Sequence, residues 1–188
     1  MKEVEILVSV LEDKEKVLKA LSNFKYNGIK KVLDIYIYHP KTNKFHFENK
    51  ECLRIRKKDS KNFLTYKKDN FDSMGNWVYS DEYEIEISDF ETAIKIMEQL
   101  GLKELIKIDN EKHTFVTDMY EIVLEDVKDL GLFLEVERFE VKDEEDIPAI
   151  KKDIRKFIDK LGIEVSKELN FGKPELMLKK QNSVNNFP

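Results

Sequence analysis

Charged and apolar side chains alternate along the extended segments of this chain. In residues 3–10, Val4 and Ile6 fall on one face, and Glu3 and Glu5 fall on the other. Successive side chains of a β-strand point to opposite faces, so this period of two predicts strands with one apolar and one charged face. Strands of this kind form either an open sheet with one wet face or a closed sheet whose charged face lines an interior.

The sequence periods predict an α+β domain. Strands are expected at residues 3–10, 30–38, 52–57, 62–68, 77–88, 102–117, 119–125 and 132–141. Apolar residues spaced three and four apart predict helices at residues 13–24, 89–100 and 146–161. Short connections and hairpin turns favour a mainly antiparallel sheet. We expect a single domain over residues 1–180 and a polar, disordered tail over residues 181–188.

The charge balance excludes several classes of partner. The chain has 33 Lys and Arg residues against 38 Asp and Glu residues, which gives a net charge of −5. A general nucleic-acid binder needs a basic excess or a basic stripe, so we expect no nucleic-acid partner. No apolar run in the sequence approaches the roughly 20 residues that span a bilayer, so we expect a cytoplasmic protein with no membrane partner. The single cysteine, Cys52, excludes an internal disulfide framework.

The charged strand faces carry acids on some strands and bases on others. They hold the acidic pairs Glu3 and Glu5, Glu82 and Glu84, and Glu135 and Glu137, and the bases Arg54, Arg56 and Lys67. In an open sheet these charges would meet water. In a closed sheet each needs a partner or a ligand, because burying a lone charge costs several kcal/mol. Paired carboxylates suit Mg²⁺ or Mn²⁺, and arginines suit phosphate oxygens, which is the combination that a metal–polyphosphate complex requires.

Six segments, in the expected order, resemble signatures of one family. The opening Glu3-Val4-Glu5 resembles the start of an ExExK motif, and residues 34–36 resemble a D-x-Y segment. LRIR at 53–56 followed by LTYK at 64–67, EYE at 82–84, and VKDLGLFLEVE at 127–137 match further family segments. This resemblance, over roughly residues 1–140, is to the CYTH superfamily of triphosphate tunnel metalloenzymes. That superfamily includes class IV adenylyl cyclases, thiamine triphosphatases and inorganic triphosphatases, and the class IV cyclase-like branch is the most similar.

The resemblance implies a closed, eight-stranded antiparallel β-barrel, or tunnel, with helices packed outside. It implies Mg²⁺ or Mn²⁺ as cofactor and a nucleoside, inorganic or thiamine triphosphate as substrate, and it is compatible with a homodimer. The metal ligands that it implies are Glu3, Glu5, Glu125, Glu135 and Glu137. The residues that it implies for triphosphate binding are Arg54, Arg56, Lys67 and Lys112, with Glu82 and Glu84 as further tunnel-lining acids. It assigns no catalytic residue in this chain.

The chain departs from the family pattern at four positions. The lysine that ends the ExExK motif is Leu7 here, and the later K-x-R segment has Asn110 and Lys112 in place of lysine and arginine. An aspartate of the pattern is replaced by Glu125. Leucine and asparagine carry no charge, and lysine lacks the forked donor geometry of arginine. The candidates for a compensating cation are Lys31, Lys107 and His113.

These departures leave two functions open. The first is an enzyme that cyclises ATP to cyclic AMP and pyrophosphate, or that hydrolyses a triphosphate compound. The second is a non-catalytic binder of nucleotides or polyphosphate with a degenerate tunnel site, because the cations expected at Leu7 and Asn110 are missing. A third reading, a domain whose charged sheet face simply meets water, does not account for the extended motif match.

Overall fold

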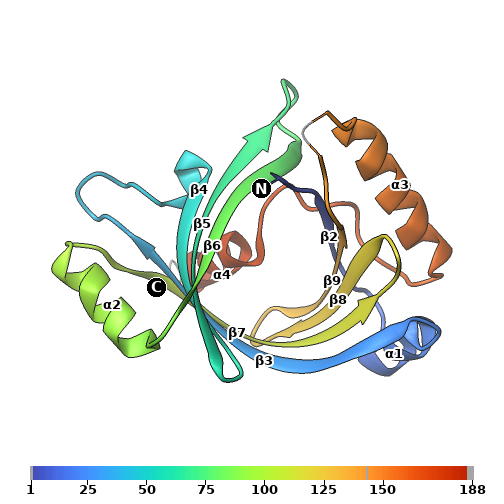
Figure 1. Cartoon of the computed structure of the whole chain (residues 1–188), viewed down its shortest axis with the longest axis horizontal. Coiled ribbons are helices and arrows are strands. Elements are labelled where there is room, and N and C mark those ends of the chain that lie inside the picture. The colour runs from blue at the N-terminus through green and yellow to red at the C-terminus, as the bar shows by residue number, and fades with distance from the viewer. Residues whose placement is uncertain (1, 143, 186–188) are drawn as a thin grey trace.

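A single antiparallel sheet curls into a nearly closed barrel (Figure 1). The computed structural model describes residues 2–142 and 144–185. The nine strands follow the order β1-β6-β5-β4-β3-β7-β8-β9-β2. Their bounds are β1 Lys2–Glu3, β2 Glu5–Ser9, β3 Lys25–Tyr38, β4 Glu51–Lys58, β5 Lys61–Phe71, β6 Trp77–Ile87, β7 Lys103–Val116, β8 Tyr120–Val127 and β9 Gly131–Arg138. The barrel and the α+β class confirm the sequence prediction.

The strand count differs from the predicted eight because the first predicted strand is split at Val4. Before the split, Glu3 pairs with Ser80 of β6, and after it Glu5 pairs with Glu137 of β9. One N-terminal segment therefore joins both edges of the sheet. Because unpaired strand edges are open to aggregation, this join also protects the backbone of the barrel.

A later segment bridges the remaining gap between β2 and β6. The Leu169 N–H donates to the Leu7 carbonyl oxygen at 2.9 Å. On the opposite side, the Trp77 N–H donates to Asn170 Oδ1 at 3.2 Å. These contacts fix the chain along the barrel just before the last helix begins, and they therefore determine where that helix enters.

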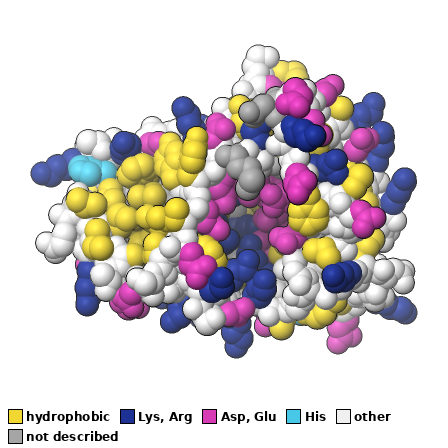
Figure 2. Space-filling model, in the orientation of Figure 1, with side chains coloured by type: hydrophobic (Ala, Val, Ile, Leu, Met, Phe, Trp, Pro, Cys, Tyr) yellow, Lys and Arg dark blue, Asp and Glu magenta, His cyan; other side chains and the backbone are white. Residues whose placement is uncertain are grey.

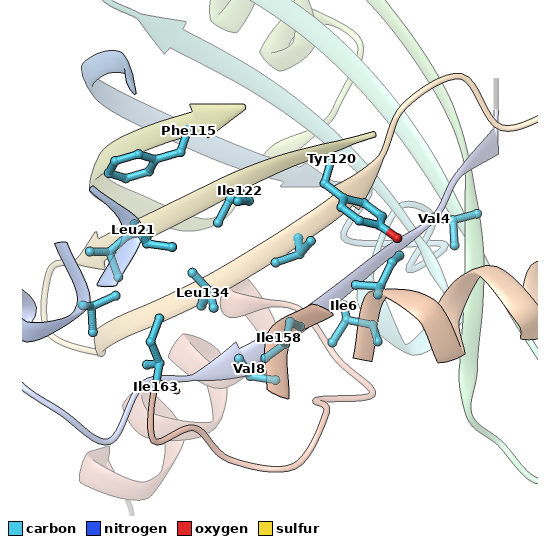
Figure 3. Close-up of a cluster of buried hydrophobic side chains, with 14 of the residues drawn as sticks. Val4, Ile6, Val8, Leu21, Phe115, Tyr120, Ile122, Leu134, Ile158 and Ile163 are labelled. Carbon is cyan, nitrogen blue, oxygen red and sulfur yellow. The ribbon is translucent and has the colours of Figure 1, made fainter. Parts of the chain in front are cut away.

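The three predicted helices form and pack outside the barrel. They are α1 Lys14–Leu21, α2 Phe90–Gln99 and α3 Ile147–Lys160. The outer side chains of β2, β8 and β9 form the largest core with α1 and α3, and Figure 3 shows Ile6, Leu134 and Ile158 in this cluster. Each such fully buried aliphatic side chain contributes about 1.5–3 kcal/mol relative to exposure. None of the described helices is both long and apolar enough to cross a membrane.

A fourth helix, α4 Lys173–Asn185, is missing from the sequence prediction. In Figure 1 it is seen through the barrel opening. Its Met177 packs in a buried cluster with the inward-facing Leu7, Ile108 and Phe133. The disorder predicted from residue 181 is therefore corrected to helix as far as Asn185, while residues 186–188 lie outside the described part of the chain. Packing against the barrel, which no local sequence period reveals, stabilises this helix.

Candidate functional site

The barrel encloses a cavity of about 270 Å³ whose wall carries both signs of charge. Figure 2 shows acidic and basic side chains gathered around the hollow in this face of the molecule. Of the predicted site residues, ten line the cavity: Glu3, Glu5, Arg54, Arg56, Lys67, Glu82, Glu84, Lys112, Glu135 and Glu137. The remaining one, Glu125, is fully buried and is not part of the cavity wall. The charged faces of the strands therefore line an interior, as in the closed-sheet alternative.

Three carboxylates from β1, β2 and β9 form an acidic cluster of Glu3, Glu5 and Glu137. Each offers an oxygen, and these oxygens lie within 4.8 Å of one another. Burial, reinforced by the charges of Glu3 and Glu135, raises the pKa of Glu137 to about 8. Burial and the charges of Glu135 and Glu3 hold the pKa of Glu5 well above its usual range.

A divalent cation would relieve the repulsion within the acidic cluster. Among the described residues, Glu5 and Glu137 make no ion pair, whereas Glu3 contacts Lys67. Closely spaced carboxylate oxygens are ligands that Mg²⁺ and Mn²⁺ prefer. The donor set of the acidic cluster therefore fits the divalent ion that the resemblance implies.

The arginines of β4 face the cavity from the opposite part of the wall. Arg56 donates through Nε and Nη2 to the two carboxylate oxygens of Asp34 at 2.7 and 2.8 Å. Arg54 Nη2 donates to Thr65 Oγ1 at 3.1 Å and to Glu84 Oε2 at 3.4 Å. Arg54 Nε is buried and has no hydrogen-bond partner among the described residues. Although burial opposes the shift, Arg56 lowers the pKa of Asp34 below its usual range.

Lys67 of β5 joins the acidic cluster to the basic wall. Its ammonium contacts Glu3 and lies 2.7 Å from Glu82 Oε2. Burial alone would lower the pKa of Lys67, but the charges of Glu3 and Glu5 raise it well above the ordinary value. Lys67 is therefore a buried, charged lysine. A metal ion at the acidic cluster would compete with it for Glu3, while its contact with Glu82 would remain.

A second group of acids is neutralised by lysines. Lys112 Nζ lies 2.7 Å from Glu125 Oε1. Lys173, at the start of α4, lies 2.7 Å from the same oxygen and 2.5 Å from Glu135 Oε2. We call Glu125 and Glu135 the lysine-bridged pair. Burial opposes ionisation of Glu135, yet Lys173 and then Lys112 hold its pKa below the usual range.

Lys173 is the functional candidate that the sequence did not reveal. It follows Gly172 in a segment without a strand period, so no alternation places it on an inner face. Lys58 is a second missed cavity residue, and it continues the alternation of Arg54 and Arg56 along β4. Burial, followed by the neighbouring Lys30 and Arg56, lowers the pKa of Lys58. The period of two on β4 was thus a usable signal for Lys58.

The three candidates for a compensating cation are wrong. Lys31 and Lys107 are exposed and do not line the cavity. His113 is held on the outer side of the barrel, where Nδ1 lies 3.2 Å from the Tyr26 hydroxyl and Nε2 lies 3.2 Å from Glu111 Oε1. The additional lysines that line the cavity are Lys58 and Lys173, and Lys173 comes from a region that strand spacing cannot place.

The two uncharged positions of the family pattern have different surroundings. Leu7 is 2% exposed and packs in the apolar cluster with Met177 of α4. Asn110 is 5% exposed, and its Nδ2 donates to Glu125 Oε2 at 3.0 Å. Its Oδ1 is buried without a hydrogen-bond partner among the described residues. Leu7 thus helps to hold α4 against the barrel, and Asn110 donates a hydrogen bond to Glu125 of the lysine-bridged pair.

Comparison with known proteins gives the family. The model of the CYTH domain matches residues 1–171. The chain belongs to the CYTH domain family. It is 36% identical over 138 residues to a Methanocaldococcus jannaschii protein named putative adenylate cyclase, and the match covers 73% of this chain and 77% of that protein.

Solved structures share the fold. The PH1819 protein of Pyrococcus horikoshii is similar with a TM-score of 0.80 and 28% identity, over 95% of this chain and 99% of that one. A Hippeastrum protein is similar with a TM-score of 0.63 and 14% identity, over 96% of each chain. It was described as a putative adenylyl cyclase with a dominant triphosphatase activity. The CYTH match ends at residue 171, so Lys173 and the rest of α4 lie beyond it.

Proposed function

We propose that this protein binds a triphosphate compound together with Mg²⁺ or Mn²⁺ in its tunnel and catalyses metal-dependent phosphoryl chemistry. The observation that supports this proposal is the division of one tunnel cavity into a basic wall and an acidic cluster. A triphosphate needs cations around its oxygens, and its metal ion needs carboxylates on the other side. Membership of the CYTH family supports the same substrate class.

The acidic cluster of Glu3, Glu5 and Glu137 would hold the metal ion. When bound, such an ion neutralises phosphate charge and polarises a phosphoryl oxygen. The chain itself provides the position of that ion, since Glu5 and Glu137 are paired residues of adjacent strands. These strands are part of the rigid barrel and not of a loop, so the ligand geometry is established before substrate arrives.

Arg54, Arg56, Lys67 and Lys112 would bind the phosphate oxygens. In the structure, each already contacts a carboxylate. These carboxylates keep the cations charged and positioned when no ligand is bound. Phosphate oxygens would then replace or supplement them. Catalysis in such a site consists mainly of positioning and electrostatic stabilisation, both of which a prearranged wall supplies.

Two reactions on a triphosphate are compatible with this site. One is cyclisation of ATP to cyclic AMP with loss of pyrophosphate, in keeping with the name of the M. jannaschii relative. The other is hydrolysis of tripolyphosphate, thiamine triphosphate or a nucleotide, in keeping with the description of the Hippeastrum protein. Cyclisation needs an aligned ribose hydroxyl, whereas hydrolysis needs only a positioned water. A cytoplasmic location, the absence of a nucleic-acid partner and a homodimeric assembly remain part of the proposal.

A non-catalytic binder is the second candidate, because Leu7 and Asn110 stand where the family pattern has lysines. Lys173 favours the enzyme over the binder. It brings an ammonium group to Glu125 and Glu135, so the tunnel wall recovers a cation that the sequence pattern lacks. The charge that catalysis requires is therefore present, although it comes from another part of the chain.

Turnover assays test the proposal. The purified protein is incubated with ATP, tripolyphosphate or thiamine triphosphate, each with Mg²⁺, Mn²⁺ or EDTA, and both phosphate release and cyclic AMP are measured. We expect turnover of at least one compound with metal and none with EDTA, and we expect Arg56→Ala to lose it. Metal-dependent binding without turnover would establish the binder instead. Absence of both binding and turnover would contradict a triphosphate site.

A further inference from the structure

The five acids expected as metal ligands have two different electrostatic environments. The acidic cluster has oxygens close enough to share a metal ion. The lysine-bridged pair instead has the ammonium of Lys173 between its two carboxylates, 2.7 Å from Glu125 Oε1 and 2.5 Å from Glu135 Oε2. All five acids were expected as metal ligands from the family resemblance. The structure therefore separates them into a set of three and a set of two.

The fold itself determines the position of the Lys173 ammonium. Residues 166–170 are hydrogen-bonded along the barrel, and α4 starts three residues later, at Lys173. The Gly172 N–H donates to Glu175 Oε2 at 2.8 Å, and Met177 is buried against the barrel. The Lys173 side chain is 13% exposed, so its charge is held inside the tunnel.

We infer that the Lys173 ammonium takes the place of a second divalent ion, so that the tunnel binds one metal ion per chain, at the acidic cluster. This inference rests on the proposed function. It extends that function by giving the number of metal ions. That number follows from Lys173, which lies outside the segment that matches the CYTH model. In this protein a fixed charge of the chain performs part of the charge neutralisation that a second, exchangeable ion would supply.

The cost of displacing Lys173 supports a single ion. An ion bound to Glu135 and Glu125 would separate the ammonium from both of its carboxylates. A buried charge left without its partner is strongly destabilising, so this exchange is unfavourable. An ion at the acidic cluster displaces no lysine from Glu5 or Glu137 among the described contacts. It competes with Lys67 only at Glu3, and Lys67 keeps its 2.7 Å contact with Glu82. It also offsets the repulsion that Glu3 and Glu135 exert on Glu5 and Glu137.

Counting bound Mn²⁺ tests the inference without substrate or turnover. The full chain is titrated with Mn²⁺ alone, and free Mn²⁺ is measured by electron paramagnetic resonance. We expect one ion per chain in the wild type and two in Lys173→Met, which keeps most of the side-chain volume but removes the charge. Lys173→Arg keeps the charge and should bind one. The second ion of Lys173→Met should disappear when Glu135→Gln is added.

Lys151→Met is the matched control. Lys151 is equally buried, at 14% side-chain exposure, and is paired with Glu168, but it does not line the cavity. It should bind one ion, as the wild type does. Two ions in the wild type, or one in a folded Lys173→Met variant, would overturn the inference and leave the proposed function intact. No bound ion in the wild type would overturn the metal-dependent function itself. If Lys173→Met does not fold, the wild-type count still decides.

Discussion

The acidic cluster and the lysine-bridged pair lie on adjoining strands of one barrel, yet they have opposite electrostatic properties. Glu135 and Glu137 lie two residues apart on β9 and face the same cavity. Burial and neighbouring acids raise the pKa of Glu137 to about 8. Burial acts on Glu135 in the same direction, but Lys173 and Lys112 outweigh it and lower the pKa of that residue.

This difference shows that residue type and strand position do not determine what a carboxylate does. Both glutamates belong to the same LEVE segment and would be assigned the same role from sequence. Their roles differ because α4 brings Lys173 to one of them and not to the other. An acid without a cation partner is available for a metal ion, whereas an acid already paired with lysine is part of the fixed electrostatic structure.

Placing a lysine at position 7 should have the largest effect, and it should disrupt the lysine-bridged pair. Leu7 is 2% exposed and packs in the apolar cluster that holds α4 against the barrel. Leu7→Lys would bury a charge among these apolar side chains and compete with Lys173 for Glu135, the cross-strand neighbour of position 7, so we expect a loss of about 3–5 kcal/mol in the free energy of unfolding. Chemical denaturation measures this loss, and Leu7→Met is the control, with less than about 1.5 kcal/mol.

The same variant distinguishes two views of Leu7. If Leu7 only marked the loss of a tunnel cation, Leu7→Lys would raise turnover and keep wild-type stability. If Leu7 packs against the helix that carries Lys173 and holds it in place, the variant should be less stable, and α4 should exchange its amide hydrogens faster. A stable variant with increased turnover would contradict the second view.

Removing one ligand of the acidic cluster should have the next largest effect. Glu5→Gln keeps the size of the side chain but removes its negative charge. We expect at least about a 100-fold loss in Mn²⁺ affinity, since even outer groups around a metal contribute about 10–100-fold. Isothermal titration calorimetry measures the affinity. Glu86→Gln, at an exposed carboxylate that does not line the cavity, is the control and should leave the affinity unchanged.

The pH dependence of Mn²⁺ binding should reveal the raised pKa of Glu137 in the acidic cluster. Glu137 has a pKa raised from 4.5 to about 8, so below pH 8 an entering ion must displace its proton. As the pH rises from about 6 to 8, the Mn²⁺ dissociation constant should therefore fall by up to about tenfold for each pH unit. Titrations at several pH values measure this slope. A constant affinity across the range would mean that no proton is displaced.

The same shift predicts a stability trend of definite sign. Because the folded pKa of Glu137 is raised, protonation stabilises the metal-free protein. This contribution is complete below about pH 4.5 and is lost as the pH rises through about 8. The lowered pKa of Glu135 acts in the opposite sense, because its stabilisation is present above 4.5 and is lost in acid. Thermal unfolding of Glu137→Gln should lack the loss between pH 4.5 and 8.

Most of the barrel could be predicted from sequence because strand alternation is a local property. The faces of Glu3, Glu5, Arg54 and Arg56 follow from a period of two, and all four residues line the cavity as expected. The split of the first strand at Val4 could not be predicted in this way, since it depends on two edges of the sheet meeting in space.

The remainder of the site depends on long-range packing. Glu125 shares the inward face of β8, but Lys112 and Lys173 cover it, so it is excluded from the cavity wall. Lys173 lies 48 residues from Glu125 in the chain. No periodicity connects such distant positions, and α4 has too weak an amphipathic pattern to predict which side faces the barrel.

The smallest effect is expected for an ion pair outside the tunnel. Lys61 and Glu86 form a 2.9 Å pair on β5 and β6 with side chains 61% and 55% exposed. Water screens these charges, so a double-mutant cycle of Lys61→Ala and Glu86→Ala should give a coupling energy below about 1 kcal/mol. Chemical denaturation of the four proteins measures it. The same cycle on Lys173 and Glu135, whose side chains are 13% and 15% exposed, should give a clearly larger value. Equal coupling in both cycles would mean that burial does not strengthen the lysine bridge, and the contrast between the two acidic groups would lose its physical basis.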